Sequence, residues 1–358
     1  MLVWYEKTYR CPHCSSRETI RRGIRRGKLK YFCNACRRWF QINRRQKKSS
    51  SYLNAHLSGV SFRTLATVNG IGVATAYRYT LKELQLLPHC ADITRKYCNR
   101  FCGILVVDGK YVKVKGYERK IPVLYGVDYL THDIPTYLLS IAENYQTCIS
   151  FFQSLRLLNY PLQAVVCDDN INIYQAAQQI YPSVVIQLCH NHYKQTIRTS
   201  LDVSHDPTSV PFMRDIEQLF ETRRSKDELI IRGRKLLHRY GENERYVSVL
   251  IDIQRRFEVL TGYTKAKRIP RTTNLIECFN SHLEGRLKTI KGFESFTHAD
   301  NWLNAYFIKR RLKPFTDCSG RFRGLNGKCS LEETRKSYYK IDALLKLFKW
   351  PFWNGTAC

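Results

Sequence analysis

Long hydrophobic runs are missing from this sequence. No apolar stretch approaches the roughly 20 residues that a helix needs to cross a bilayer, and the N-terminal segment MLVWYEKTYR lacks the apolar part of a secretory signal peptide. We therefore expect no membrane partner and a cytoplasmic location. In that reducing compartment the 14 cysteines would be free thiols or metal ligands rather than a disulfide framework.

Acidic residues are also scarce. The 358 residues include 59 Lys and Arg but only 30 Asp and Glu, which gives a formal net charge of +29. Because the basic residues recur along the whole chain, the charge indicates a polyanionic partner, with nucleic acid as the first candidate. A basic protein that is merely soluble is the alternative. With 44% hydrophobic residues, the chain is globular and long enough for more than one domain.

Two Cys-x2-Cys pairs near the N-terminus have the spacing of a structural zinc site. They are separated by 18 residues and consist of Cys11 and Cys14, and of Cys33 and Cys36. Four thiolates complete the tetrahedron of Zn2+, so the metal would fold a ribbon over residues 1–45 and would not catalyse. Chance clustering of cysteines is the alternative. The arginines that we assign to contacts with DNA phosphates are Arg21, Arg22, Arg25 and Arg26.

Residues 46–92 have the pattern of two helices joined by a tight turn. One apolar helical pattern runs to about Val68, and a second begins at Val73. Gly70 and Gly72 supply the turn between them, and the spacing fits a DNA-binding helix-turn-helix. An ordinary helical hairpin fits the pattern equally well. In a helix-turn-helix, the residues near base edges would be Thr75, Tyr77 and Arg78.

Residues 100–200 predict an α/β core. The expected order is three strands, helix, strand, helix, strand, helix, beginning with the apolar run ILVVD at residues 104–108, after which DGKYVKVKG turns back. An antiparallel meander followed by parallel strands with crossover helices is typical of a ribonuclease H-like fold. Residues 201–270 are mostly helical, and a further helix lies in residues 271–313, with Thr272 or Thr273 able to cap it. Residues 314–358 form a basic, aromatic tail whose rings we expect to pack in a core.

Two strands of this core end in carboxylates. Asp108 closes the first and Asp168 the fourth, and these strands are neighbours in a ribonuclease H-like sheet. Adjacent carboxylates repel unless a divalent cation lies between them, and Mg2+, or Mn2+ in its place, prefers oxygen ligands. Our choice for a third acid is Glu277, which would complete a site for two metal ions. Glu284 competes, but we expect it to pair with Lys288 one turn later.

Asp168 is followed by a second acid, Asp169. Asp168 occupies the last position of the strand, whereas Asp169 and Asn170 fall where the next helix needs a cap. We therefore expect Asp168 to bind metal and Asp169 to cap the helix. The alternative is that both acids serve only as caps, because strand-to-helix turns often carry Asp for that reason.

These residues together resemble the DDE transposases of the Mutator-like group over roughly residues 101–313. That pattern has an acid after the first strand, a second acid at a later strand end, a Cys-x2-His, and a late Glu followed by Asn. The matching positions are Asp108 in VVDG, Asp168 in VVCDD, Cys189 and His192 in QLCHNH, and Glu277 and Asn280 in NLIECFN. Separately, the first forty residues resemble zinc ribbons of the form CPxCxS…RxG…YxCxxC in bacterial insertion-sequence transposases.

The resemblance implies metal-dependent cleavage of double-stranded DNA at transposon ends, followed by attack of the released 3′ hydroxyl on target DNA. It also implies that residues 201–270 are a helical insertion in the catalytic core. A homodimer or a larger assembly on DNA is expected because two ends must meet, and the expected location is the nucleoid of a prokaryotic host, or the nucleus of a eukaryotic one.

Three interpretations of Cys189 and His192 stay open: a second zinc site, packing at the start of a helix, or a motif beside the active site. His190 fits the third as well as His192 does. Two other functions also stay open. One is a regulator descended from a transposase that binds DNA without cutting it, and the other is a ribonuclease H-like nuclease acting on branched DNA or RNA hybrids.

Overall fold

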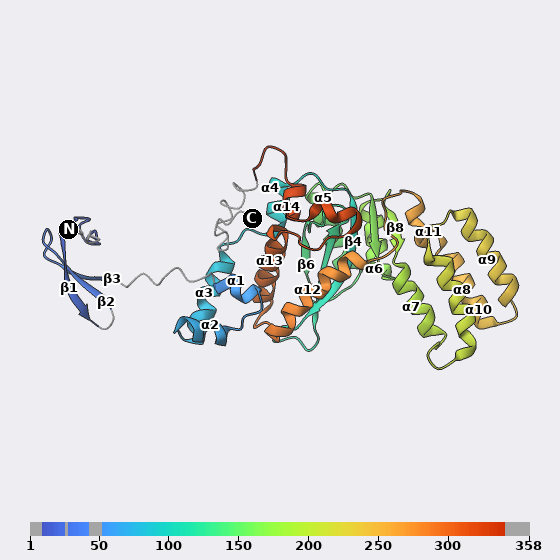
Figure 1. Cartoon of the computed structure of the whole chain (residues 1–358), viewed down its shortest axis with the longest axis horizontal. Helices are drawn as coiled ribbons and strands as arrows, with labels where there is room; N and C mark the ends of the chain where they lie inside the picture. The colour runs from blue at the N-terminus through green and yellow to red at the C-terminus, as the bar shows by residue number, and fades with distance from the viewer. Residues whose placement is uncertain (1–8, 26–27, 43–51, 341–358) are drawn as a thin grey trace.

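The structure is a computed structural model that describes residues 9–25, 28–42 and 52–340. Arg26 and the end of the tail, residues 341–358, lie outside the described residues. Figure 1 shows α1–α3 on one side of a central sheet and the helices α7–α11 gathered at the opposite end.

The first described unit is a small antiparallel sheet with the order β1-β2-β3. Its strands are β1 (Thr19–Arg25), β2 (Lys28–Cys33) and β3 (Trp39–Ile42). The apolar interior is small: the rings of Tyr31 and Phe40 stack with centroids 5.6 Å apart, and Cys11 and Cys33 are buried beside them. A core of this size stabilises a fold only with an additional cross-link, such as a metal.

Three helices follow, and the break between the second and the third falls where the apolar pattern predicted it. They are α1 (Tyr52–Leu57), α2 (Phe62–Asn69) and α3 (Val73–Gln85). The hydroxyl of Ser61 accepts a hydrogen bond from Thr64 N and starts α2, and Gly70, with φ of 63°, ends it in the left-handed conformation. Helix α3 packs against α13 (Phe296–Leu312), so the three-helix unit rests on the rest of the protein.

The central sheet has the strand order β6-β5-β4-β7-β8. Its strands are β4 (Ile104–Val112), β5 (Ile121–Asp128), β6 (Tyr137–Leu139), β7 (Ala164–Cys167) and β8 (Val185–Leu188). The first three pair antiparallel, whereas β7 pairs parallel with both β4 and β8. The crossover helices α5 (Tyr145–Leu157) and α6 (Ile171–Ile180) connect the parallel strands. The element order is the one that the sequence predicted.

The expected turn after residue 108 was wrong. Strand β4 continues through Asp108 to Val112, and the chain turns back only over residues 113–120. The alternating residues after Asp108 extend the strand because β5 pairs with them, the register placing Asp108 opposite Tyr125. The parallel pairing with β7, however, stops at Val106.

Each face of the sheet is covered by a different set of helices. Val106, Val166 and Trp302 belong to one apolar cluster, which includes α12 (Asn274–Ile290) and α13. Leu105 and Val165, one residue earlier on the same strands, belong to the cluster on the opposite face. Because successive strand residues point to opposite faces, every second residue of β4 and β7 points towards α12.

The long helical segment after β8 forms the bundle at one end of Figure 1. Its helices are α7 (His190–Ser200), α8 (Val210–Glu221), α9 (Lys226–Tyr240), α10 (Glu244–Arg255) and α11 (Phe257–Leu260). Across the described residues, no helix is both long and apolar enough to cross a membrane.

A buried ion pair ties the C-terminal described segment to the core. Arg311 and Asp133 are 1% and 0% exposed, and two guanidinium nitrogens lie 2.8 Å from the two carboxylate oxygens. Asp133 also accepts hydrogen bonds from Ser330 and Thr334, which belong to α14 (Ser330–Thr334). Helix α4 (Cys90–Tyr97) contributes Thr94 Oγ1, 2.8 Å from the Arg311 guanidinium. A buried charge is tolerated when it is paired and hydrogen-bonded in this way.

Candidate active site

The four N-terminal cysteines converge. Sγ of Cys11 lies 3.6 Å from Sγ of Cys36, and Sγ of Cys14 lies 3.6 Å from Sγ of Cys33. All four sulfur atoms lie within 4.8 Å of one another. Thiolates around Zn2+ would be about 3.8 Å apart, because Zn–S bonds are about 2.3 Å. The cluster therefore fits a zinc ribbon, and the exposed side chains beside it on β1 are Arg21, Arg22 and Arg25.

The residues expected to read bases from α3 differ in their surroundings. Arg78 is exposed, and its guanidinium lies 3.4 Å from Thr75 Oγ1. Tyr77 instead packs edge-on between the rings of Phe62 and His298, with centroids 5.3 and 5.5 Å away. The ring of Tyr77 thus joins α3 to α2 and α13.

Asp108 and Asp168 each follow the last paired residues of β4 and β7 by two positions. Val106 pairs with Val166 as the last pair between these strands. Asp108 contacts Asn280 of α12, and Asp168 contacts Thr273, the residue just before α12. The pKa of Asp108 is raised to about 6, first by burial and then by the negative charge of Asp168. The two carboxylates are therefore close enough to interact.

Asn280 on α12 holds Asp108. Its Nδ2 donates to Asp108 Oδ2 at 2.5 Å, and its Oδ1 accepts from the buried hydroxyl of Tyr125 at 2.6 Å. Tyr125 is the cross-strand partner of Asp108 on β5. These three side chains connect β4, β5 and α12, and the other oxygen of Asp108, Oδ1, accepts a hydrogen bond from Gly109 N at 2.7 Å.

Thr273, just before α12, joins the other two acids. Its Oγ1 lies 2.8 Å from Glu277 Oε1 and 3.3 Å from Asp168 Oδ1, and the residue is 1% exposed. The sequence offered Thr273 only as a helix cap. Although it is the N-cap residue, its side chain makes no capping bond, because its hydroxyl is turned towards the carboxylates. Residues 273 and 277 are one turn apart and share a helical face.

His192 and Cys189 lie at this cluster, and His190 does not. His192 Nδ1 is 2.6 Å from Asp168 Oδ1 and 3.9 Å from Glu277 Oε1. Cys189 is buried, its Sγ accepts a hydrogen bond from Thr273 N at 3.4 Å, and Sγ lies 3.1 Å from Thr273 Oγ1. Ligand atoms of Asp168, Cys189 and His192 all lie within 4.8 Å of one another. His190 is buried against Phe220, with its Nε2 2.8 Å from Leu260 O.

The role expected for Asp169 was wrong. Asn170 caps α6, with its Oδ1 accepting from Asn172 N at 3.1 Å. Asp169 forms an ion pair with Arg256, at the end of α10, and Arg256 also binds Asp252 at 3.0 Å. The residue beside Asp168 thus anchors the long helical segment to the central sheet.

Glu284 makes the contact that was expected and one more. Its carboxylate lies 3.6 Å from Lys288 Nζ and 3.2 Å from Lys110 Nζ. These contacts lower the pKa of Glu284, chiefly through the hydrogen bond with Lys110. Glu284 is therefore held as an ionised carboxylate by two lysines, whereas Glu277 faces Thr273 and His192.

The donor set fits a divalent cation. Asp108, Asp168 and Glu277 offer carboxylate oxygens, the ligands that Mg2+ and Mn2+ prefer. Burial raises the pKa of Asp168, against the opposing charge of His192, and its charge raises the pKa of Asp108. A cation between the acids would relieve this repulsion.

Comparison with known proteins gives the family. The family model described as "Transposase, Mutator family" matches residues 44–307. The chain belongs to the Mutator family of transposases. It is also similar to the transposase for insertion sequence element IS256 in transposon Tn4001, from Staphylococcus aureus and from Enterococcus faecalis (strain ATCC 700802 / V583). Each relative is 22% identical over 292 residues, which is 75% of this chain and 72% of the relative.

The matched range of this transposase contains the three-helix unit and every residue of the carboxylate cluster, and it begins after the ribbon. Sequence reasoning missed the contacts made by Thr273, Tyr125 and Arg256. A threonine one turn before Glu277 was a usable signal for the first. Tyr125 and Arg256 reach the site only through strand pairing and helix packing, which leave no local pattern.

Proposed function

We propose that this transposase is a DDE enzyme with a ribonuclease H-like core, which binds the terminal repeats of its element and catalyses metal-dependent DNA cleavage and strand transfer. One observation carries the proposal: acids from β4, from the end of β7 and from α12 are joined by Thr273 and Asn280. The strand order β6-β5-β4-β7-β8, antiparallel and then parallel, supports the core assignment.

In this mechanism Asp108, Asp168 and Glu277 would hold two Mg2+ or Mn2+ ions. Such ions, when bound, activate the attacking oxygen and stabilise the leaving oxygen of a phosphodiester. The protein's part is to position the carboxylates. Asn280 orients Asp108, while Thr273 and His192 orient Asp168. Neighbours that fix metal-binding side chains in this way typically raise affinity or activity by about 10- to 100-fold.

The N-terminal units would supply DNA recognition. A zinc-folded ribbon with the exposed Arg21, Arg22 and Arg25 suits phosphate contacts, and the exposed Arg78 on α3 suits the major groove. The helices α7–α11, anchored at Asp169 by Arg256, are the proposed insertion, which would hold DNA ends or a second subunit. Two ends must be joined, so the active form is at least a dimer.

A cleavage and strand-transfer assay tests the proposal. Purified protein is incubated with Mg2+ and a DNA fragment carrying the gene's own flanks, and Asp168→Asn is run beside Asp169→Asn. Loss of both reactions in Asp168→Asn, with activity retained in Asp169→Asn, is expected. Tight binding of the flanks by the wild type without cleavage, in Mg2+ and in Mn2+, would instead indicate a DNA-binding regulator.

A further inference from the structure

A strongly basic cavity lies where the three-helix unit meets the helices α12 and α13. It has a volume of about 350 Å3, and its walls come from the end of α1, the middle of α12 and the end of α13. Its basic lining residues are His282, Arg286, Lys309, Arg310 and Lys313. We call this cavity the junction pocket.

Among the described residues that line the junction pocket there is no carboxylate. Burial, and after it the positive charges of Arg286 and Lys313, lower the pKa of Lys309 to about 8. Asp317 lies near enough to His282 to favour its protonated form, but Arg310 and Lys313 oppose this more strongly. Gathering cations without an acid costs free energy in the free protein, and an anion in the pocket would recover it.

Three of the cationic groups, those of Arg286, Lys309 and Arg310, are held in place before any ligand arrives. Arg286 donates to Ser58 O at 2.9 Å, and Lys309 donates to Ser58 Oγ at 2.7 Å. The guanidinium of Arg310 lies over the ring of Phe279, 4.6 Å from its centroid. Gly59 has φ of +100°, and a Cβ there would lie 3.3 Å from the Arg286 guanidinium. The corner after α1 therefore fits closely against α12, and little ordering remains to oppose binding.

The pocket lies between the two parts of the protein that are proposed to act on DNA. Helix α12 carries Glu277 in its first turn and Arg286 nine residues later, which is about 14 Å along the axis at about 1.5 Å per residue. On B-DNA this distance corresponds to about four base steps of about 3.4 Å. Nine residues also turn the helix through about two and a half revolutions, so Arg286 and Glu277 point to opposite sides of α12. A strand with a phosphate in the junction pocket would therefore pass around α12 on its way to the carboxylates.

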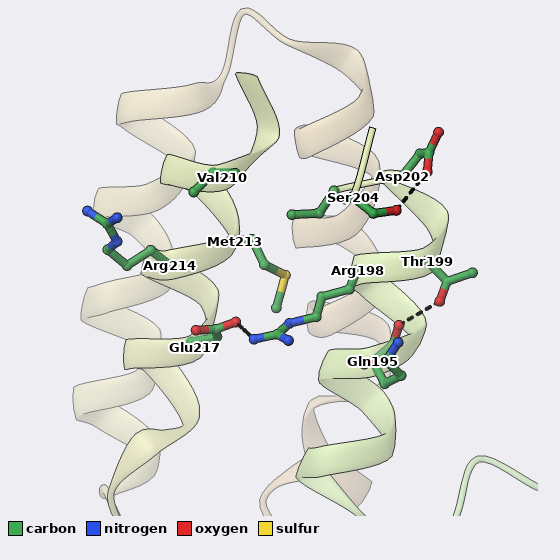
Figure 2. Close-up of a pocket in the computed structure, with 10 residues that line it drawn as sticks. Gln195, Arg198, Thr199, Asp202, Ser204, Val210, Met213, Arg214 and Glu217 are labelled. Atoms are coloured by element: carbon green, nitrogen blue, oxygen red, sulfur yellow. Dashed lines mark hydrogen bonds and ion pairs between the residues drawn. The ribbon is translucent and has the colours of Figure 1, made fainter. Parts of the chain in front are cut away.

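A larger cavity in the protein lacks this character. It lies between α7 and α8, and its lining carries charges of both signs. Figure 2 shows the ion pair between Arg198 and Glu217 that spans it. Because its acids already neutralise its bases, that cavity has no comparable attraction for an anion.

We propose that the junction pocket binds a phosphate of the DNA backbone, at a position between the segment bound by α1–α3 and the phosphodiester held at Asp108, Asp168 and Glu277. This inference rests on the proposed function. The pocket would fix the distance from the recognised sequence to the cleavage position.

Binding of the full-length protein to duplexes carrying the gene's flanks, and to an unrelated duplex, tests the pocket without Mg2+. The variant is Arg286→Gln combined with Lys313→Gln, and Arg286→Lys is the conservative control. Arg95→Gln, which removes an exposed charge paired with Asp92 on α4, is the control for net charge. Thermal unfolding shows whether each variant is folded.

The salt dependence of binding gives the first result. Loss of one phosphate contact should flatten the plot of log K against log salt by about 0.9 per phosphate, on both duplexes, with Arg286→Lys close to wild type. A slope that changes no more than in Arg95→Gln would overturn the proposal.

Single methylphosphonates, placed one at a time along the flanks, locate the contact. Neutralising one phosphate between the bound repeat and the cleavage position should weaken wild-type binding about tenfold, and the same change should have no effect in the double variant. If the methylphosphonate weakens binding by the double variant as much as it weakens binding by wild type, the proposed contact between the pocket and this phosphate is contradicted. Millimolar inorganic phosphate that binds wild type but not the variant, with no methylphosphonate effect, would assign the pocket to a free anion instead.

The two proposals can fail separately, because these measurements need no catalysis. If wild type binds DNA with this phosphate profile but never cuts it, the junction pocket proposal stands and the DDE assignment is contradicted. If wild type cuts DNA and the double variant keeps the wild-type phosphate profile, the DDE assignment stands and the junction pocket proposal is contradicted.

Discussion

The cysteine cluster and the carboxylate cluster are built in opposite ways. The four thiols all belong to residues 11–36, where the two Cys-x2-Cys pairs meet beside a small antiparallel sheet. The acids come from residues 108, 168 and 277, and they meet only after five strands and the helix α12 are assembled. A local site can be recognised from spacing alone, whereas a site built from distant segments requires the topology first.

The surroundings of the two clusters differ as well. In the ribbon, the thiols are themselves much of the apolar core, together with Tyr31 and Phe40. At the carboxylates, the core is complete without them, and Asp168 and Glu277 keep 33% and 45% of their side chains exposed. Loss of a metal should therefore unfold the first site and leave the second folded but inactive.

Cys33→Ser should give the largest effect, because it acts on folding. Structural zinc contributes roughly 10–16 kcal/mol in small zinc-binding units, so the ribbon should lose both its zinc and its strands. Metal analysis should show about one zinc per chain in wild type and none in the variant, with the melting of the catalytic core unchanged. Cys318→Ser is the matched control, and a zinc content unaffected by Cys33→Ser would contradict the ribbon assignment.

Asp168→Asn should abolish cleavage without unfolding the protein. Removing a ligand of a catalytic metal costs several kcal/mol of transition-state stabilisation, which is about 1,000-fold or more in rate. The measurement is single-turnover cleavage of the flanking DNA in Mg2+. Glu284→Gln makes the same chemical change on α12 and should stay within a few fold of wild type; equal losses in both variants would contradict the choice of acids.

Thr273→Val should have an intermediate effect. The substitution keeps the shape but removes the hydroxyl that contacts Glu277 and Asp168, so we expect a loss of about 10- to 100-fold in activity or in apparent metal affinity. Thr273→Ser retains the hydroxyl and should restore most of it. Measuring the cleavage rate at increasing Mn2+ concentration separates a loss of activity from a loss of apparent metal affinity. If Thr273→Val and Thr273→Ser give the same titration curve, the Thr273 hydroxyl has no positioning role.

Tyr125→Phe should give the smallest change. It removes the hydroxyl that donates to Asn280 Oδ1 and leaves a buried amide oxygen unpaired, which costs about 1–3 kcal/mol of stability. Cleavage should fall only a few fold, since Asn280 still contacts Asp108. Tyr338→Phe removes a hydroxyl from a residue that is 70% exposed, and its melting temperature should match wild type.

Local signals in the sequence were enough to predict the helices and strands, but not the contacts between them. The break at residues 69–72 predicted the end of α2 and the start of α3, because glycine conformations act within one turn. The order of strands and helices also followed from the apolar pattern. Asp108, by contrast, was expected at a strand end and lies inside β4, since pairing with β5 extends the strand beyond its pairing with β7.

The candidate site shows the same division. The sequence was enough to select the three acids Asp108, Asp168 and Glu277. The structure adds the side chains that contact them, which are Asn280, Thr273 and His192. Asp169 pairs with Arg256, which lies far along the chain at the end of another helix. The sequence near Asp169 therefore suggested only a capping role for it. Tyr77 was read as a base contact, but its ring packs between Phe62 and His298, a placement that depends on how α3 meets α13.

The buried pair of Arg311 and Asp133 has a consequence for synthesis of the chain. Asp133 is made long before its partners, and its last two hydrogen-bond donors, Ser330 and Thr334, arrive only near the end of translation. A chain that stops before residue 330 keeps the carboxylate cluster in its sequence but leaves a buried charge short of two donors. Prematurely terminated chains should therefore fold poorly, and few of them would compete with the complete protein.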